Sequence, residues 1–119
     1  MPDPSSGDLK ALADTRLSEA MLLLEGKHYS GAYYLAGYAV ECGIKAIIAA
    51  SFKSGVIPSG RFVERVYSHD LKQLMALAGL SDLIDAACRA SSDLEANWAL
   101  VALWSEASRY EIIDPSALP

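Results

Sequence analysis

Residues 31–50 read GAYYLAGYAVECGIKAIIAA and are apolar on nearly every face of the helix that they predict. A helix that is hydrophobic all round is either a membrane span or the buried centre of a helical bundle. Glu41 and Lys45 lie in mid-segment, where each would cost about 2.5–3.5 kcal/mol at the centre of a bilayer. Small residues such as Gly37 and Gly43 let neighbouring helices approach closely. We therefore predict a central bundle helix here and no membrane span.

Further helices are predicted on both sides of this segment from apolar spacing, glycine stops and serine caps. Residues 54–67, with two glycines and a proline, read as a connection with one extra turn. No segment alternates over strand length, so we predict an all-α, up-and-down bundle of four to five helices. Trp98 and Trp104 are expected to anchor its core. The predicted helices are about 8–25 ended by Gly26, about 30–52 capped by Ser30, about 69–78 capped by Ser68 and ended by Gly79, about 82–90 capped by Ser81, and about 93–110.

The chain has 119 residues, which fits one domain. We expect a lead-in over 1–7, a single helical domain over 8–112 and a tail over 113–119. A hydrophobic content of 52% is enough for a core and excludes disorder of the whole chain. Cys42 and Cys88 form no disulfide framework and the chain opens without a signal-like segment, so a cytoplasmic location is expected.

Charge is unevenly distributed along the chain. The net charge of −5 argues against a protein that binds nucleic acid non-specifically through its overall charge. Residues 41–75 nevertheless carry five basic and three acidic side chains and form the net-positive stretch of the sequence. A local basic site and scattered surface charge are both consistent with this pattern. Its cationic residues are Lys45, Lys53, Arg61, Arg65 and Lys72, with His69 among them.

One stripe of the central helix carries polar groups. Tyr34, Tyr38, Glu41 and Lys45 are spaced i, i+4, i+7 and i+11, so they share one face. In a structural interpretation, Glu41 and Lys45 form a helical ion pair that holds the register. In a functional one, the stripe lines a cleft or a dimer seam, where Glu41 orients a cation or base and Lys45 meets a phosphate.

Other candidates lie near the ends of predicted helices. His69 opens the third helix, and a lone histidine is more often structural than a metal ligand, so we expect no metal and no cofactor. Arg109, followed by Tyr110, either stabilises the end of the last helix or projects a phosphate-binding guanidinium. If these residues form a site, one cleft gathers at least three of Glu41, Lys45, His69 and Arg109. The sequence carries no common catalytic template.

Three stretches resemble the HEPN domain, a nucleotide-binding helical domain of prokaryotes and higher eukaryotes. They are residues 29–46, with the pattern A-x-x-L-A-x-x-A-x-E-x-x-x-K-A, then His69-Asp70-Leu71, and residues 104–110. The resemblance covers about 10–112. It implies a four- or five-helix bundle, usually homodimeric, with roles in RNA cleavage or beside a minimal nucleotidyltransferase in toxin–antitoxin and defence loci. Glu41 and Lys45 match the acid and base of the second-helix motif, and His69 matches the histidine that opens the next helix.

The sequence departs from the family's ribonuclease pattern at the end of the bundle. Ribonuclease members carry an Arg followed four to six residues later by a His, and no His follows Arg109 here. That imidazole would move the proton of the attacking 2′-hydroxyl. We therefore predict a non-catalytic or divergent module that works with a nucleotide, RNA or a partner protein. Two alternatives stay open: a metal-independent ribonuclease that uses Arg109 and His69, and a purely structural interaction domain.

Overall fold

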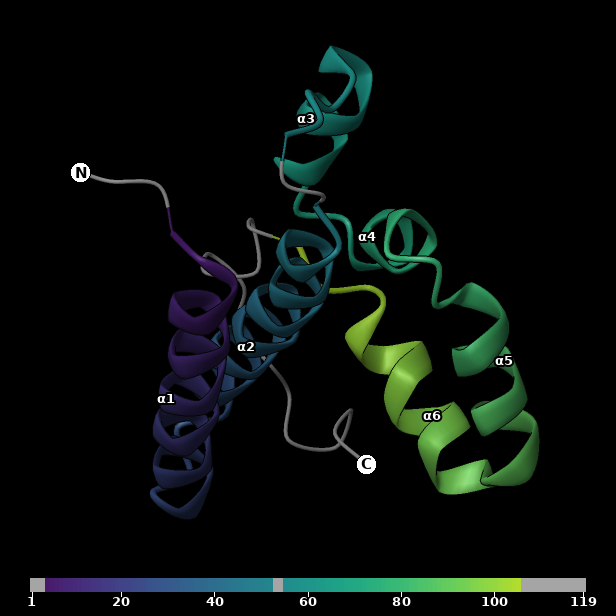
Figure 1. Ribbon diagram of the computed structural model, residues 1–119. Helices are drawn as coiled ribbons and strands as arrows, with labels where there is room; N and C mark the ends of the chain where they lie inside the picture. Colours follow the sequence, from purple (N-terminus) through teal and green to yellow (C-terminus); the bar gives the residue numbers. More distant parts are fainter. Residues whose placement is uncertain (1–3, 53–54, 106–119) are drawn as a thin grey trace.

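The computed structural model describes residues 4–52 and 55–105, and 76% of these residues are helical, with no strand among them (Figure 1). The predicted all-α bundle is confirmed, and the described ranges hold six helices where four or five were expected. They are α1 (Ser6–Glu25), α2 (Tyr29–Ala50), α3 (Gly60–Val66), α4 (Leu71–Leu77), α5 (Ser81–Ala90) and α6 (Ser92–Val101).

The first helix begins inside the stretch predicted as a lead-in. Ser5 and Asp8 form a capping box, in which each side chain accepts a hydrogen bond of 3.0 Å from the other residue's backbone N–H. Hydrogen bonds from the backbone and side chain of Ser5 lower the pKa of Asp8. α1 ends at Glu25 as predicted, but Gly26 is not the left-handed residue: its φ is −79°, and Lys27 has φ 64°.

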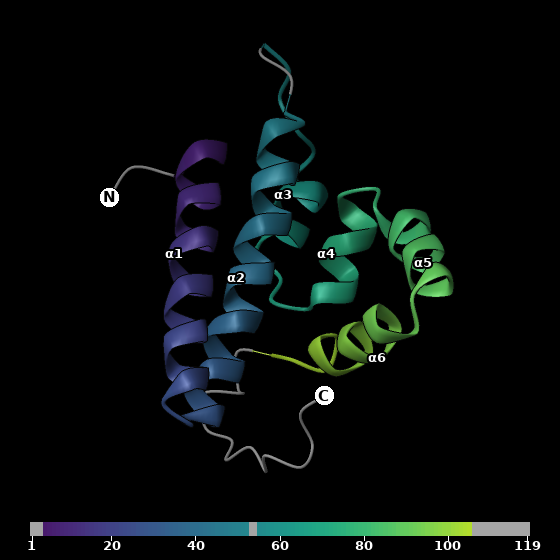
Figure 2. The same cartoon turned by 90° about the horizontal axis from the view of Figure 1, so that it is seen from below.

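The second helix is the central one, as predicted. It lies side by side with α1 and runs in the opposite direction (Figures 1 and 2). The prediction that Ser30 caps it is wrong, because the helix already begins at Tyr29. His28 is the N-cap and forms no side-chain hydrogen bond there. No helix in the described ranges is long and apolar enough to span a membrane. The buried residues of α2 are Ala32, Gly37, Ala39, Glu41, Cys42, Ile44, Ala46 and Ile48.

A short helix occupies part of the predicted connection. α3 is capped by Ser59, whose hydroxyl accepts from the backbone N–H of Phe62 at 3.1 Å. α4 starts later than predicted because Asp70, and not Ser68, is its N-cap; the Asp70 carboxylate accepts from the backbone N–H of Gln73 at 3.1 Å. His69 therefore precedes the helix instead of opening it.

The last two helices form a hairpin beside α4 (Figure 2). The N-cap of α5 is Leu80, so the prediction that Ser81 caps this helix is wrong. Ser91 caps α6 by accepting from Leu94 N–H. α6 ends at Val101 and not near 110, because the chain turns after it and Trp104 packs onto α2. Residues 106–110 of the predicted helix lie outside the described residues.

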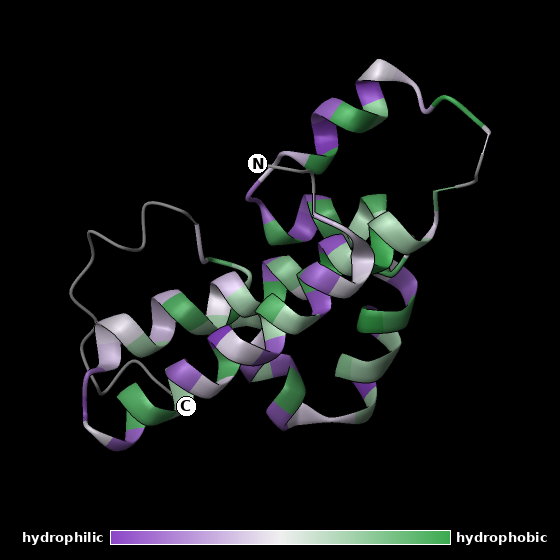
Figure 3. Ribbon diagram, turned by 60° about the vertical axis from the view of Figure 1, so that its left-hand side comes forward, coloured by the Kyte–Doolittle hydropathy of each residue, from purple (hydrophilic) through white to green (hydrophobic). Residues whose placement is uncertain are grey.

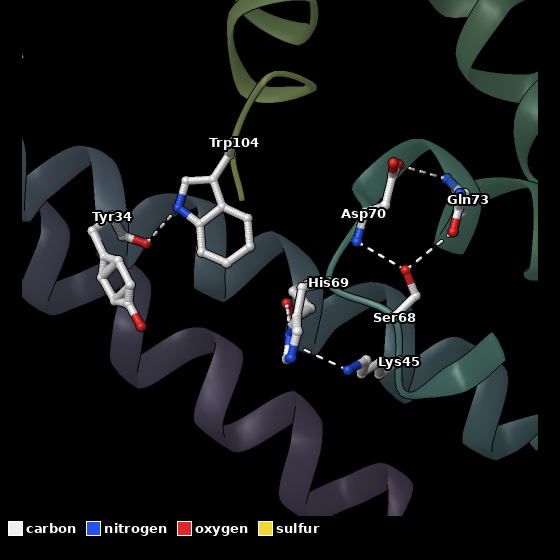
Figure 4. Close-up of polar contacts among 8 residues, drawn as sticks. Tyr34, Lys45, Ser68, His69, Asp70, Gln73 and Trp104 are labelled. Carbon is white, nitrogen blue, oxygen red and sulfur yellow. Dashed lines mark hydrogen bonds and ion pairs between the residues drawn. The ribbon is translucent and has the colours of Figure 1, made fainter. Parts of the chain in front are cut away.

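The core forms between the α2 and α4 helices and the end of the described chain. Trp104 is buried, as predicted, and Trp98 is half-buried and packs against the same core. Trp104 lies over Gly37, where a Cβ would clash with the indole. Its Nε1–H donates to the backbone oxygen of Tyr34 at 3.1 Å (Figure 4). The buried members of the core are Ile44, Ile48, Leu71, Leu74 and Trp104.

Candidate functional site

A buried carboxylate joins α2 to the turn before α4. The Glu41 side chain is 4% exposed, and its Oε2 accepts a hydrogen bond of 3.2 Å from Lys45 Nζ. Its Oε1 lies 2.9 Å from Nδ1 of His69. Figure 4 shows His69 and Lys45 converging on this point from different segments. We call these three side chains the Glu41 cluster.

The turn that carries His69 is fixed by its own hydrogen bonds. The Ser68 hydroxyl accepts from the backbone N–H of Asp70 at 3.0 Å and donates to Oε1 of Gln73 at 3.2 Å. Together with the Asp70 cap, these contacts hold residues 68–73 in one arrangement (Figure 4). His69 is thereby presented to α2. Asp70 followed three residues later by Gln73 is the spacing of a capping box, and this signal could have located the cap.

Burial strengthens the electrostatic interactions within the Glu41 cluster. A carboxylate taken out of water is stable only when it is paired and hydrogen-bonded, and Glu41 has a partner at each oxygen. Lys45 is 15% exposed and His69 is 45% exposed, so the two nitrogen-bearing side chains reach towards the surface while the acid stays inside. Because Lys Nζ has three donor hydrogens, two remain beyond its contact with Glu41.

Two more side chains continue the same stretch of α2. Tyr38 and Cys42 lie one helical turn apart, and each affects the pKa of the other. Burial raises the pKa of Tyr38, with a smaller contribution from Cys42. Burial likewise raises the pKa of the Cys42 thiol. Cys42 and Cys88 are both free cysteines.

The structure brings together three of the six predicted site residues. Glu41, Lys45 and His69 are in contact, and Tyr38 lies one turn before Glu41 on α2. Arg109 and Tyr110 lie outside the described residues. In the part of the chain that the structure describes, no group of three or more His, Cys, Asp or Glu side chains could hold a metal ion.

Comparison with known proteins identifies a family for this chain. The family model described as HEPN domain matches residues 7–112. No curated protein and no solved structure matches the chain. The matched range contains α2 to α6, all of α1 except Ser6, and the Glu41 cluster. The chain therefore belongs to the HEPN family and is, in general terms, a nucleotide- or RNA-related helical module.

Proposed function

We propose that the protein is a non-catalytic or divergent HEPN module that binds a nucleotide or RNA at the Glu41 cluster. The observation that carries the proposal is the buried Glu41 carboxylate, which holds Lys45 at 3.2 Å and His69 at 2.9 Å at one place near the surface. Lys45 would meet a phosphate with its remaining donors. Glu41 and His69 fix the position from which it does so.

The module would work in the cytoplasm as a homodimer, together with a partner protein. HEPN domains often dimerise, and α1 and α2 leave an apolar groove of about 280 Å³ between them. Exposed Leu17, Met21 and Leu24 border this groove. An apolar face of this kind supports a homodimer with a self-complementary helical interface. A nucleotidyltransferase partner in a toxin–antitoxin or defence-type system is the context that the family resemblance implies.

A second candidate function is metal-independent RNA cleavage by His69 and Arg109. The observation that favours it is the contact between Glu41 Oε1 and His69 Nδ1. A carboxylate at Nδ1 fixes the orientation of an imidazole, and an oriented imidazole is the group that would exchange a proton with the substrate. Arg109 would then stabilise the charge that develops on the phosphate.

One pair of assays separates these functions. Parent protein and an Arg109→Ala, His69→Ala double variant are incubated with end-labelled single-stranded RNA in EDTA. We expect no cleavage by either; cutting by the parent that the double variant loses would establish the ribonuclease.

The second assay measures binding of fluorescent RNA. Lys45→Gln should weaken binding, whereas Lys10→Gln, which removes an exposed charge from α1, should not. Thermal melts confirm that each variant is folded. If the folded parent binds neither RNA nor a mononucleotide, the purely structural interaction domain remains as the function.

A further inference from the structure

A second groove lies between α3 and α4, next to the turn that carries His69. It has a volume of about 640 Å³, within the usual range of small-molecule sites. Figures 1 and 3 show α3 standing away from the α1–α2 pair, with hydrophilic and hydrophobic residues mixed along it. The groove is lined by Phe62 and Arg65 from α3 and by Gln73, Ala76 and Leu77 from α4.

The polar groups of this groove are hydrogen-bond donors. Arg65 is exposed, and among the described residues no acidic side chain forms an ion pair with it. Gln73 uses its Oε1 to accept from Ser68, which leaves its amide NH₂ to donate. Among the residues that the structure describes, no carboxylate lines the groove. A ligand that fits these groups offers acceptor atoms and negative charge.

The rest of the lining is apolar. Ala76 and Leu77 form one wall, and Phe62 forms part of the other. The Phe62 ring is held by Phe52 at the end of α2, with ring centroids 5.5 Å apart and an interplanar angle of 78°. A flat apolar group can therefore lie against fixed side chains while its charged end meets the donors.

The groove and the Glu41 cluster are linked through one turn. Ser68 contacts both the backbone before α4 and the Gln73 side chain, and His69 is the next residue (Figure 4). The α3–α4 region also lies in the net-positive stretch of the sequence, whereas residues 76–105 carry one basic and four acidic side chains. A polyanion approaching the molecule is therefore favoured on this side.

We propose that the α3–α4 groove binds one nucleotide unit of a single-stranded RNA whose neighbouring unit reaches the Glu41 cluster. The base lies against Phe62, Ala76 and Leu77, and Arg65 and Gln73 donate to phosphate or carbonyl oxygens. This inference rests on the proposed function, because it extends the same binding surface from α2 to α3. It makes Arg65 a specific phosphate contact.

The test measures the binding of a fluorescein-labelled oligouridylate about twelve nucleotides long. Fluorescence anisotropy gives the binding constant at several salt concentrations. Arg65→Gln should weaken binding about tenfold and reduce the slope of log K against log salt by about 0.7. Arg89→Gln removes a charge that is also exposed, at the end of α5, and should leave both quantities unchanged. Ala76→Phe fills the groove without changing charge and should also weaken binding.

The outcomes separate this inference from the proposed function. If Lys45→Gln weakens binding while Arg65→Gln and Ala76→Phe behave like Arg89→Gln, the groove is not a subsite and the proposed function stands. If the folded parent binds a mononucleotide but not the oligonucleotide, this inference fails and the proposed function stands. If it binds neither, both fail. With uridine 5′-monophosphate as the probe, NMR shifts of the Gln73 side-chain NH₂ support the groove, and shifts confined to Lys45 and His69 overturn it.

Discussion

Glu41 and His69, 28 positions apart in the sequence, meet at 2.9 Å between Oε1 and Nδ1. This contact connects the central helix to the turn before α4, and it places an imidazole over a carboxylate that water hardly reaches. The same carboxylate holds Lys45. Changes to one member of this cluster should therefore affect both the stability of the fold and the ligand surface.

Lys45→Met should lower the free energy of unfolding by about 3 kcal/mol, because it leaves a buried carboxylate with one partner. Urea denaturation measures the difference. The matched control is Arg16→Met, which removes the cation of the α1 pair Arg16–Glu19 (2.8 Å) near the surface; it should cost less than about 1 kcal/mol. Equal losses of unfolding free energy for the two variants would show that the Glu41–Lys45 pair contributes no more to stability than an ion pair near the surface.

Gly37→Ala should destabilise the protein by about 1–3 kcal/mol, because the added Cβ meets the Trp104 indole and forces it off α2. Gly43 lies on the same helix with no neighbouring atom near its ideal Cβ. Gly43→Ala should therefore stabilise α2 by about 0.5–1 kcal/mol through helix propensity. Chemical denaturation followed by tryptophan fluorescence measures both. A stabilising Gly37→Ala would contradict the packing of Trp104 described here.

The free energy of unfolding should fall in alkaline solution because Tyr38 and Cys42 lose their protons there. Burial raises the pKa of both groups, and both are neutral when protonated. Since the folded state holds these protons more tightly than the unfolded chain, their contribution is complete below the ordinary Cys pKa of 9.0 and is lost as pH rises through the raised values.

The measurement is the free energy of unfolding in urea, with a reducing agent present, between neutral pH and pH values above 9.0. A Tyr38→Phe, Cys42→Ala double variant should lose less stability over this range than the parent. Tyr67→Phe changes an exposed tyrosine and should follow the parent. Parallel curves for the parent and the double variant would contradict the prediction.

The sequence predicts local spacing better than it predicts boundaries or distant contacts. The Glu41–Lys45 pair follows from i, i+4 geometry, and the structure contains it. Residue type also indicates where a cap can form, yet Ser30 and Ser81 do not cap their helices, because the preceding turn determines where helical geometry begins. A left-handed Lys27 sets that point for α2.

Contacts between segments depend on packing that spacing does not encode. The meeting of His69 with Glu41 requires α4 to lie across α2, and this crossing depends on Leu71 and Leu74 in the core. The packing of Trp104 on α2 likewise requires a glycine at the point of contact, because a Cβ there would clash with the indole. Gly37 could be seen in the sequence as a small residue, but its partner could not be identified from its position.

A charge placed in the α1–α2 groove should break the proposed homodimer. Met21 is 59% exposed and borders this groove, and a glutamate there would be buried without a partner at a two-fold interface. Met21→Glu should raise the dimer Kd at least about tenfold, measured by sedimentation equilibrium at micromolar concentrations. Leu83→Glu, at a 66% exposed site on α5, should sediment as the parent does. A parent that sediments as a monomer, or an effect confined to Leu83→Glu, would show that α1 and α2 do not form the interface.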